Sequence, residues 1–288
     1  MQEQIAIEMK GISKSFGALK ANEDVNLSVM AGEVHALLGE NGAGKSTLMN
    51  MLSGIYQPDS GEIFVFGEKA TFASPKESIK KGIGMIHQHF KLVDVLNAKE
   101  NIIIGQPSSL FLKEKALSMN VREISDQYGL DVDPEKKVYD MSVGEKQTLE
   151  IVKVLYRGAR ILIMDEPTAV LTPQEIKKLF QIIRNMKEQG CAVVIITHKL
   201  NEVMEISDRI TILRKGRSIG TVSTSEVEVP SLIEMMVGKK VDLDIHKEKY
   251  TGNRPLLAMD SVTVKDREGK SALEDVSFTL SNYEILGV

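Results

Sequence analysis

Eight residues, from Gly39 to Ser46, have the types and spacing of a loop that wraps the phosphates of a nucleotide. They read Gly-Glu-Asn-Gly-Ala-Gly-Lys-Ser, which matches the pattern G-x-x-x-x-G-K-[ST]. Its glycines let the backbone curl so that N–H groups point inward at phosphate oxygens. In such a loop Lys45 bridges the β- and γ-phosphates, and the Ser46 hydroxyl holds Mg²⁺. An apolar run before the loop and a helical pattern after it argue against a chance glycine-rich turn.

Two carboxylates, Asp165 and Glu166, end another apolar run, Ile161-Leu162-Ile163-Met164. A strand that ends in this way places an Asp beside the Mg²⁺ of a phosphate-loop site. Glu166 could then accept a proton from the attacking water. An acidic pair at a strand end can also be merely solvated, and its combination with Lys45 favours the functional interpretation.

Three more side chains stand where predicted strands meet loops. His198 follows the apolar run 192–197 and could stabilise charge as a phosphate bond breaks, although a half-buried structural His fits as well. Gln88 follows Met85-Ile86-His87 and could touch Mg²⁺ or the attacking water, although Gln is ordinary in loops. Phe16 could stack on a base or belong to the core.

The elements that must position these residues alternate between strands and helices. Residues 5–38 and 61–67 read as strands, and a helical pattern extends from about 89 to 160, clearest from Lys113 to Tyr128. A helix from Pro173 to Gln189, with Thr172 as its N-cap, separates the strands 161–164 and 192–197. Strand, helix and strand at this spacing predict a parallel sheet and an α/β fold.

Composition excludes several classes of protein. The 288 residues carry a net charge of −4, which gives no overall attraction to nucleic acid. A single cysteine, Cys191, excludes an internal disulfide and is expected to pack in the core. The first residues do not fit a secretory signal, and no run approaches the ~18 apolar residues of a membrane span. We therefore expect any link to a membrane to run through a partner protein.

The last part of the chain resembles the first. Residues 276–288 overlay 25–37, and Met259 to Thr263 echo Met9 to Ser13, at an offset of 251 or 250. A chance match of alternating strands is the competing explanation. The charged segment 238–254 between the two parts reads as a linker, with an exposed helix as the alternative. We expect the front part of a tandem protein, cut before a second phosphate loop.

One motif points to a family. Met141-Ser142-Val143-Gly144-Glu145 resembles the signature Leu-Ser-Gly-Gly-Gln of ABC-type ATPases, with departures at Met141, Val143 and Glu145. The order of Phe16, phosphate loop, Gln88, signature, acidic strand and His198 is also the order of that family. The resemblance covers residues 5 to about 237 and resumes from about 255.

The resemblance can be narrowed. Residues 85–93, 165–175 and 235–239 look like the double-ATPase subunits of bacterial importers of simple sugars and nucleosides. The stretches 87–90 and 155–159 lean toward the nucleoside branch. This resemblance implies a phosphate-loop core of parallel strands, an antiparallel β subdomain and a helical signature subdomain at about 89–160. It also implies a first ATPase domain at 1–237, the linker 238–254, and the first strands of a second ATPase domain at 255–288.

The family resemblance further implies that ATP and Mg²⁺ lie between two ATPase halves, with Ser142 and Gly144 serving the nucleotide of the partner. It implies nucleotide contacts from Phe16, Gly39, Asn41, Gly42, Gly44, Lys45, Ser46, Thr47, Ser142 and Gly144, metal contacts from Ser46, Gln88 and Asp165, and catalytic roles for Glu166, His198 and Gln88.

The implied partners are a second ATPase half or a second copy, membrane permease subunits reached near residues 88–101, and indirectly a solute-binding protein. The implied place is the cytoplasmic face of the plasma membrane, without nucleic acid. The main rival is a soluble tandem ATPase that acts on ribosomes or nucleic acid. A short linker and an acidic chain argue against it. A nucleotide sensor without catalysis is a third possibility, against which Glu166 and His198 argue.

Overall fold

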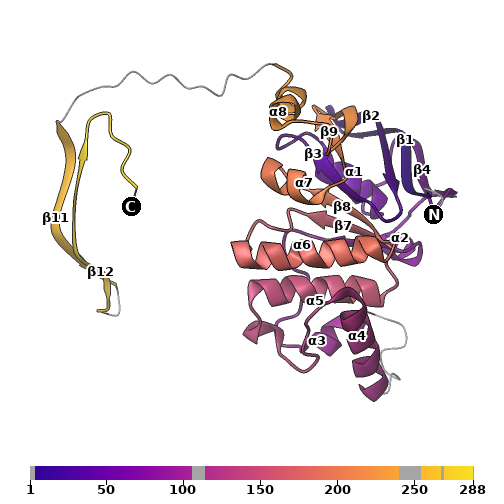
Figure 1. Cartoon of the computed structure of the whole chain (residues 1–288), viewed down its shortest axis with the longest axis horizontal. Helices are drawn as coiled ribbons and strands as arrows, with labels where there is room; N and C mark the ends of the chain where they lie inside the picture. The colour runs from indigo at the N-terminus through magenta and orange to yellow at the C-terminus, as the bar shows by residue number, and fades with distance from the viewer. Residues whose placement is uncertain (1–3, 106–113, 240–253, 267–268, 288) are drawn as a thin grey trace. The chain divides into compact units, whose positions relative to one another are not determined.

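A computed structural model describes residues 4–105, 114–239, 254–266 and 269–287. Its contacts divide the chain into two compact units, Met1–Val241 and Asp242–Val288. Each unit is described by itself (Figure 1). Within the described ranges, no helix has both the length and the apolar character that a bilayer crossing requires.

A six-stranded sheet forms the centre of the first unit. Its strand order is β10-β9-β3-β8-β7-β6, and all neighbours are parallel except β10 and β9. The strands are β3 (Val34–Leu38), β6 (Ile83–Ile86), β7 (Ile161–Asp165), β8 (Ala192–Ile196), β9 (Arg209–Arg214) and β10 (Arg217–Ser223). Every residue of β3 and β8 is buried, as expected of central strands covered on both faces. The predicted parallel sheet is confirmed.

An antiparallel sheet covers one side of this centre. Its order is β2-β1-β4-β5, from β1 (Ile5–Phe16), β2 (Leu19–Met30), β4 (Ser60–Val65) and β5 (Glu68–Ala70). Helix α1 (Lys45–Leu52) lies in the same apolar cluster as both sheets: Leu48 belongs to this cluster together with Met9 of β1 and Ile163 of β7. The phosphate loop is therefore fixed on both of its flanks by buried elements.

Helices cover the other face. The main ones are α3 (Ala98–Ile103), α4 (Glu114–Tyr128), α5 (Val143–Tyr156) and α6 (Pro173–Glu188), and Figure 1 shows α3, α4 and α5 gathered at one end of the unit. The others are α2 (Pro75–Lys80), α7 (Leu200–Ile206), α8 (Val229–Val237) and a short 3-10 turn at Val138–Asp140. Thr172 caps α6 as expected, in a capping box with Glu175.

Residues 106–113 of the stretch expected to be helical lie outside the described residues. In the described part of 89–160 the expectation of helix is wrong mainly for two longer segments. Residues 89–97 form no helix, and residues 129–142 contain only the short 3-10 turn. In the first stretch, side chains of α3 and α5 bind the backbone groups of Lys91 and Val93, so that the loop needs no helical hydrogen bonds of its own.

The second unit contains an antiparallel hairpin of β11 (Pro255–Lys265) and β12 (Ser271–Ser281). Its irregular features, a residue with positive φ and the hydrogen bond that holds it, match those of the β1–β2 hairpin. Asp24 has a φ of 51°, and its N–H donates to Ser13 Oγ at 3.0 Å. Asp275, 251 positions later, also has a φ of 51°, and its N–H donates to Thr263 Oγ1 at 3.1 Å. The resemblance between the two ends of the chain thus extends to the bonds that hold the strand bulges. The linker residues 240–253 lie outside the described part.

A buried polar cluster joins the two sheets of the first unit. The Glu33 carboxylate accepts hydrogen bonds from Arg209 Nε and Nη2, both at 2.8 Å, and contacts His35 Nδ1 at 2.8 Å. Burial alone raises the pKa of Glu33. The bonds from His35 and Arg209 outweigh this effect and lower the pKa to about 2. The ionised carboxylate is therefore a stabilising group of the fold.

We predict that Glu33→Gln destabilises the protein by about 3 kcal/mol at pH 7, because the folded-state pKa lies below the ordinary value. Stability from this group is present above pH 4.5 and is lost as the pH falls toward 2. Urea unfolding at a series of pH values should show that loss in the wild type and not in the variant. Glu62, which is exposed and pairs with Lys69, provides the control. An equal effect of Glu62→Gln would contradict the stabilising role assigned to Glu33.

Candidate nucleotide-binding site

The predicted phosphate loop connects β3 to α1, and two of its glycines are required by close backbone contacts. A Cβ on Gly39 would lie 2.3 Å from the carbonyl oxygen of Leu213. A Cβ on Gly44 would lie 2.3 Å from the carbonyl oxygen of Ala21, and Gly44 has a φ of 98°. No other residue type fits either position without a backbone shift. The loop is therefore held in its curl by the neighbouring strands.

Lys45 begins α1 and is only 7% exposed. Its Nζ donates to the carbonyl oxygens of Gly39 at 2.7 Å and Glu40 at 3.0 Å. Burial lowers the pKa of Lys45, and the charges of Glu166 and Asp165 act in the opposite direction. The loop thus holds a cation inside its own curl, beside the first N–H groups of α1. This combination of charge and free donors suits a phosphate group.

A cleft of about 520 Å³ adjoins the loop, which is a volume typical of sites for small molecules. Of the predicted residues it brings together Phe16, Asn41, Gly42, Gly44, Lys45, Ser46, Thr47, Gln88, Asp165 and Glu166. Gly39 is connected to the cleft indirectly, because its carbonyl oxygen accepts a hydrogen bond from Lys45. Segments far apart in the sequence therefore converge on one cleft.

The acidic pair lies at the end of β7. Burial and the charge of Glu166 raise the pKa of Asp165, whereas the Ser46 hydroxyl and Lys45 lower it. Glu166 has a φ of 48°, which is uncommon outside glycine and is often found at functional positions. Its Oε1 contacts His198 Nδ1 at 2.8 Å. Its Oε2 is buried and has no hydrogen-bond partner among the residues that the structure describes.

These donors fit Mg²⁺ bound together with a nucleotide. The described residues contain no group of three or more His, Cys, Asp or Glu side chains placed to hold a metal ion. Mg²⁺ commonly takes only one or two ligands from the protein and the others from phosphates and water. The Ser46 hydroxyl and the Asp165 carboxylate line the same cleft and supply such a pair, and Gln88 lines it too.

Phe16 is not a core residue, so that alternative is wrong. It is 43% exposed, and its ring meets Tyr56 edge-on with centroids 5.2 Å apart. It lines the cleft near the turn Lys215–Gly216. The sequence interpretation missed Tyr56 and this turn, although the Lys-Gly pair between two apolar runs is a turn signal.

The structure does not bring Ser142 and Gly144 into this cleft. Ser142 is the N-cap of α5 and forms a capping box with Glu145, so the departure at Glu145 has a structural role. The Gly144 N–H donates to Glu175 Oε1 at 3.1 Å, and a Cβ there would meet that carboxylate at 2.6 Å. Ser142 and Gly144 line a separate cavity of about 380 Å³. They are therefore not part of the cleft beside their own phosphate loop.

Comparisons with known proteins agree with this geometry. The family model described as "ABC transporter" matches residues 22–169. The guanosine import ATP-binding protein NupO of Bacillus subtilis is 49% identical over 99% of this chain and 56% of its own length. The nucleoside import ATP-binding protein NupA of Lactococcus lactis is 44% identical over 100% of this chain and 57% of its own length. The chain thus spans little more than half the length of these relatives.

Solved structures show the same fold. The ADP conformation of MJ1267, an ATP-binding cassette of an ABC transporter, superposes with a TM-score of 0.72 at 26% identity and covers 82% of this chain and 99% of its own. The structure of cbiO1 from Clostridium perfringens has a TM-score of 0.70 at 26% identity and covers 82% of this chain and 95% of its own.

We predict that Lys45→Ala weakens the binding of ATP in the presence of Mg²⁺ by about 100-fold, because a buried charge-assisted contact is lost. Titration with a fluorescent ATP analogue measures this change. The exposed Lys69 of β5 provides a matched control, since its partner is Glu62 and it does not line the cleft. Normal binding by the Lys45 variant would refute the assignment of the loop.

Proposed function

Because the chain belongs to the ABC transporter family, we propose that it binds and hydrolyses ATP and so powers import of a small polar solute through separate membrane permease subunits. The observation that carries this proposal is the cleft that is lined by both the buried Lys45 and the strained Glu166. A protein that binds ATP without hydrolysing it needs Lys45 but does not need Glu166.

The nucleotide binds with its phosphates along the loop from Gly39 to Thr47 and its base toward Phe16. Ser46, Asp165 and Gln88 would hold Mg²⁺, which would supply positive charge near the phosphates. Lys45 adds a second positive charge from within the loop. These groups are fixed before the substrate arrives, so they stabilise the developing charge at low reorganisation cost.

Glu166 accepts the proton of the attacking water. The backbone that carries its partly buried carboxylate is held in place, since the Glu166 N–H donates to the Ile196 carbonyl oxygen at 2.9 Å. His198 Nδ1 contacts Oε1 of this carboxylate, and Oε2 is buried without a hydrogen-bond partner among the described residues. The His198 side chain is 56% exposed, and we assign to it the stabilisation of charge as the phosphate bond breaks.

The substrate class follows from the relatives. The two named above are import proteins for guanosine and for nucleosides. A galactose/methyl galactoside import protein of Clostridium perfringens is 39% identical. We propose a nucleoside as the imported solute, with a simple sugar as the alternative. Permease subunits would hold this ATPase at the cytoplasmic face of the membrane and receive solute from a binding protein. The relatives do not favour a soluble ATPase of ribosomes or nucleic acid.

Two ATPase domains are needed for each complete site. Ser142 and Gly144 lie outside the cleft of their own domain, so we propose that they complete the site of a second domain or a second copy. The hairpin β11–β12 reproduces the bulge bonds of β1–β2, which supports its assignment to a second domain of the same kind.

We predict that Glu166→Gln retains ATP binding and lowers kcat by about 100-fold or more, because the general base is lost. Single-turnover hydrolysis and nucleotide titration separate the two steps. Glu205→Gln, which removes an exposed carboxylate of α7, is the control. Turnover at the wild-type rate in the Glu166 variant would assign proton transfer to another group.

A mixing experiment tests the shared site. Lys45→Ala removes the phosphate grip and Ser142→Arg blocks the signature, so each variant alone should be inactive. In mixed pairs, one site combines the intact loop of one chain with the intact signature of the other. About one quarter of the wild-type rate should return on mixing in equal amounts, if pairs form at random. An inactive mixture of variants that still associate would contradict the shared site.

A further inference from the structure

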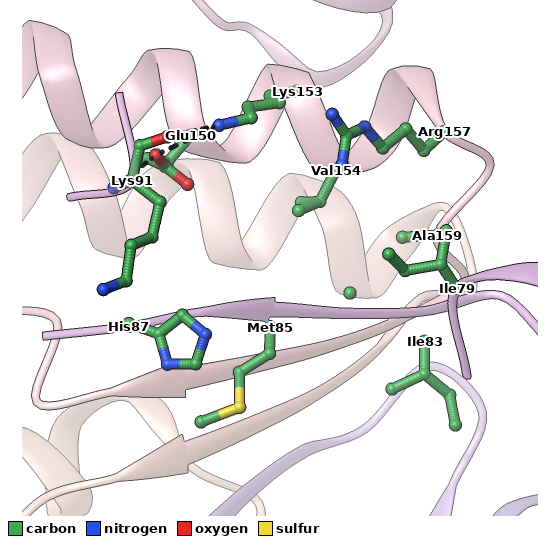
Figure 2. A pocket seen from close by; sticks show the side chains of 11 residues that line it. Ile79, Ile83, Met85, His87, Lys91, Glu150, Lys153, Val154, Arg157 and Ala159 are labelled. Atoms are coloured by element: carbon green, nitrogen blue, oxygen red, sulfur yellow. Dashed lines mark hydrogen bonds and ion pairs between the residues drawn. The ribbon is translucent and has the colours of Figure 1, made fainter. Parts of the chain in front are cut away.

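The loop that carries Gln88 is held at its backbone by charged side chains of α5. The Lys91 N–H donates to Glu150 Oε1 at 2.9 Å. The Lys91 carbonyl oxygen accepts from Lys153 Nζ at 2.7 Å. Figure 2 shows the three residues together at one side of a cavity of about 170 Å³, with His87, just after the end of β6, below them. Lys91 lies three positions after Gln88.

This clamp is buried. Glu150 is 4% exposed and Lys153 is 8% exposed, and their charged atoms are 3.6 Å apart. Two charges removed from water are costly unless they are paired and fully hydrogen-bonded. An apolar pair on this face of α5 would pack at lower cost. What the charged pair adds is the ability to bind both backbone polar groups of one loop residue, the N–H and the carbonyl oxygen of Lys91.

A second clamp of the same design holds the loop two residues further on. Asn101 of α3 is fully buried. Its Oδ1 accepts from the Val93 N–H at 2.8 Å, and its Nδ2 donates to the Val93 carbonyl oxygen at 3.1 Å. Both clamps belong to the helices that cover the sheet. The loop between β6 and α3 is therefore fastened to the helices, whereas Gln88 faces the cleft at the end of the strands.

We propose that Glu150 and Lys153 are positioning residues for Gln88. They fix the backbone just beyond Gln88 and thereby set the direction in which its amide enters the nucleotide cleft. This inference rests on the proposed function, because it assigns Gln88 a role at bound ATP and Mg²⁺. It extends that function, because helix α5 then determines how the Gln88 amide is oriented in the cleft.

The test uses the whole chain and two sets of substitutions. Lys153→Met removes the group that donates to the Lys91 carbonyl oxygen. The double variant Glu150→Gln with Lys153→Met removes the same donor without leaving a buried unpaired charge. Lys153→Arg keeps a donor. Lys99→Met is the matched control, since Lys99 is also 8% exposed and pairs with a glutamate, Glu135, at 2.7 Å.

Hydrogen exchange over residues 89–93 should accelerate about 10-fold in both Met variants and remain near the wild-type rate in the Arg and Lys99 variants. The turnover number should fall about 10-fold in the Met variants, while the Kd for ATP changes less than about twofold. In a Gln88→Ala background the same substitutions should cost no further activity, because the clamp acts through Gln88.

Unchanged exchange at 89–93 in a Met variant that binds ATP normally would overturn the clamp. So would an undiminished loss of turnover in the Gln88→Ala background, which would show that α5 acts without Gln88. Failure of the unmodified chain to bind ATP would instead reject the proposed function. The exchange measurement distinguishes the two results, since it needs no nucleotide.

Discussion

A buried ammonium group that faces two carboxylates is the electrostatic centre of this molecule. Lys45 loses hydration on entering the loop, and the carboxylates of Asp165 and Glu166 compensate part of that loss. Burial, together with the charge of Glu166, raises the pKa of Asp165. The three charges share one cleft because the phosphate loop and the end of β7 bring them together. The surrounding apolar layers therefore serve to keep this group of charges in place.

The local motifs of the site could be predicted because each is a short stretch with its own chemistry. The phosphate loop needs glycines, and the structure confirms that two of them, Gly39 and Gly44, have no room for a Cβ. The position of Asp165 and Glu166 beside the phosphate loop could be predicted from a general rule, since parallel strands end at one edge of a sheet and bring their last residues together. The parallel order of strands followed from the alternation of strand and helix.

Other features could not be predicted because they depend on tertiary contacts between distant segments. Residues 89–97 contain enough apolar positions to suggest a helix, yet side chains of α3 and α5 bind their backbone and hold a loop. Charged residues on an otherwise apolar helix face, such as Glu150 and Lys153 beside Leu149 and Val152, were the available signal. The edge-on contact of Phe16 with Tyr56 joins residues 40 positions apart and left no local pattern.

The paired bulges of the two hairpins have an evolutionary consequence. Ser13 and Thr263 both accept a hydrogen bond from the backbone of an aspartate in the left-handed conformation, although they differ in type. What the two hairpins have in common is an acceptor of the right reach, and not the identity of the side chain that carries it. Substitution is therefore expected to be tolerated least at such acceptors and most on the outward faces of the strands.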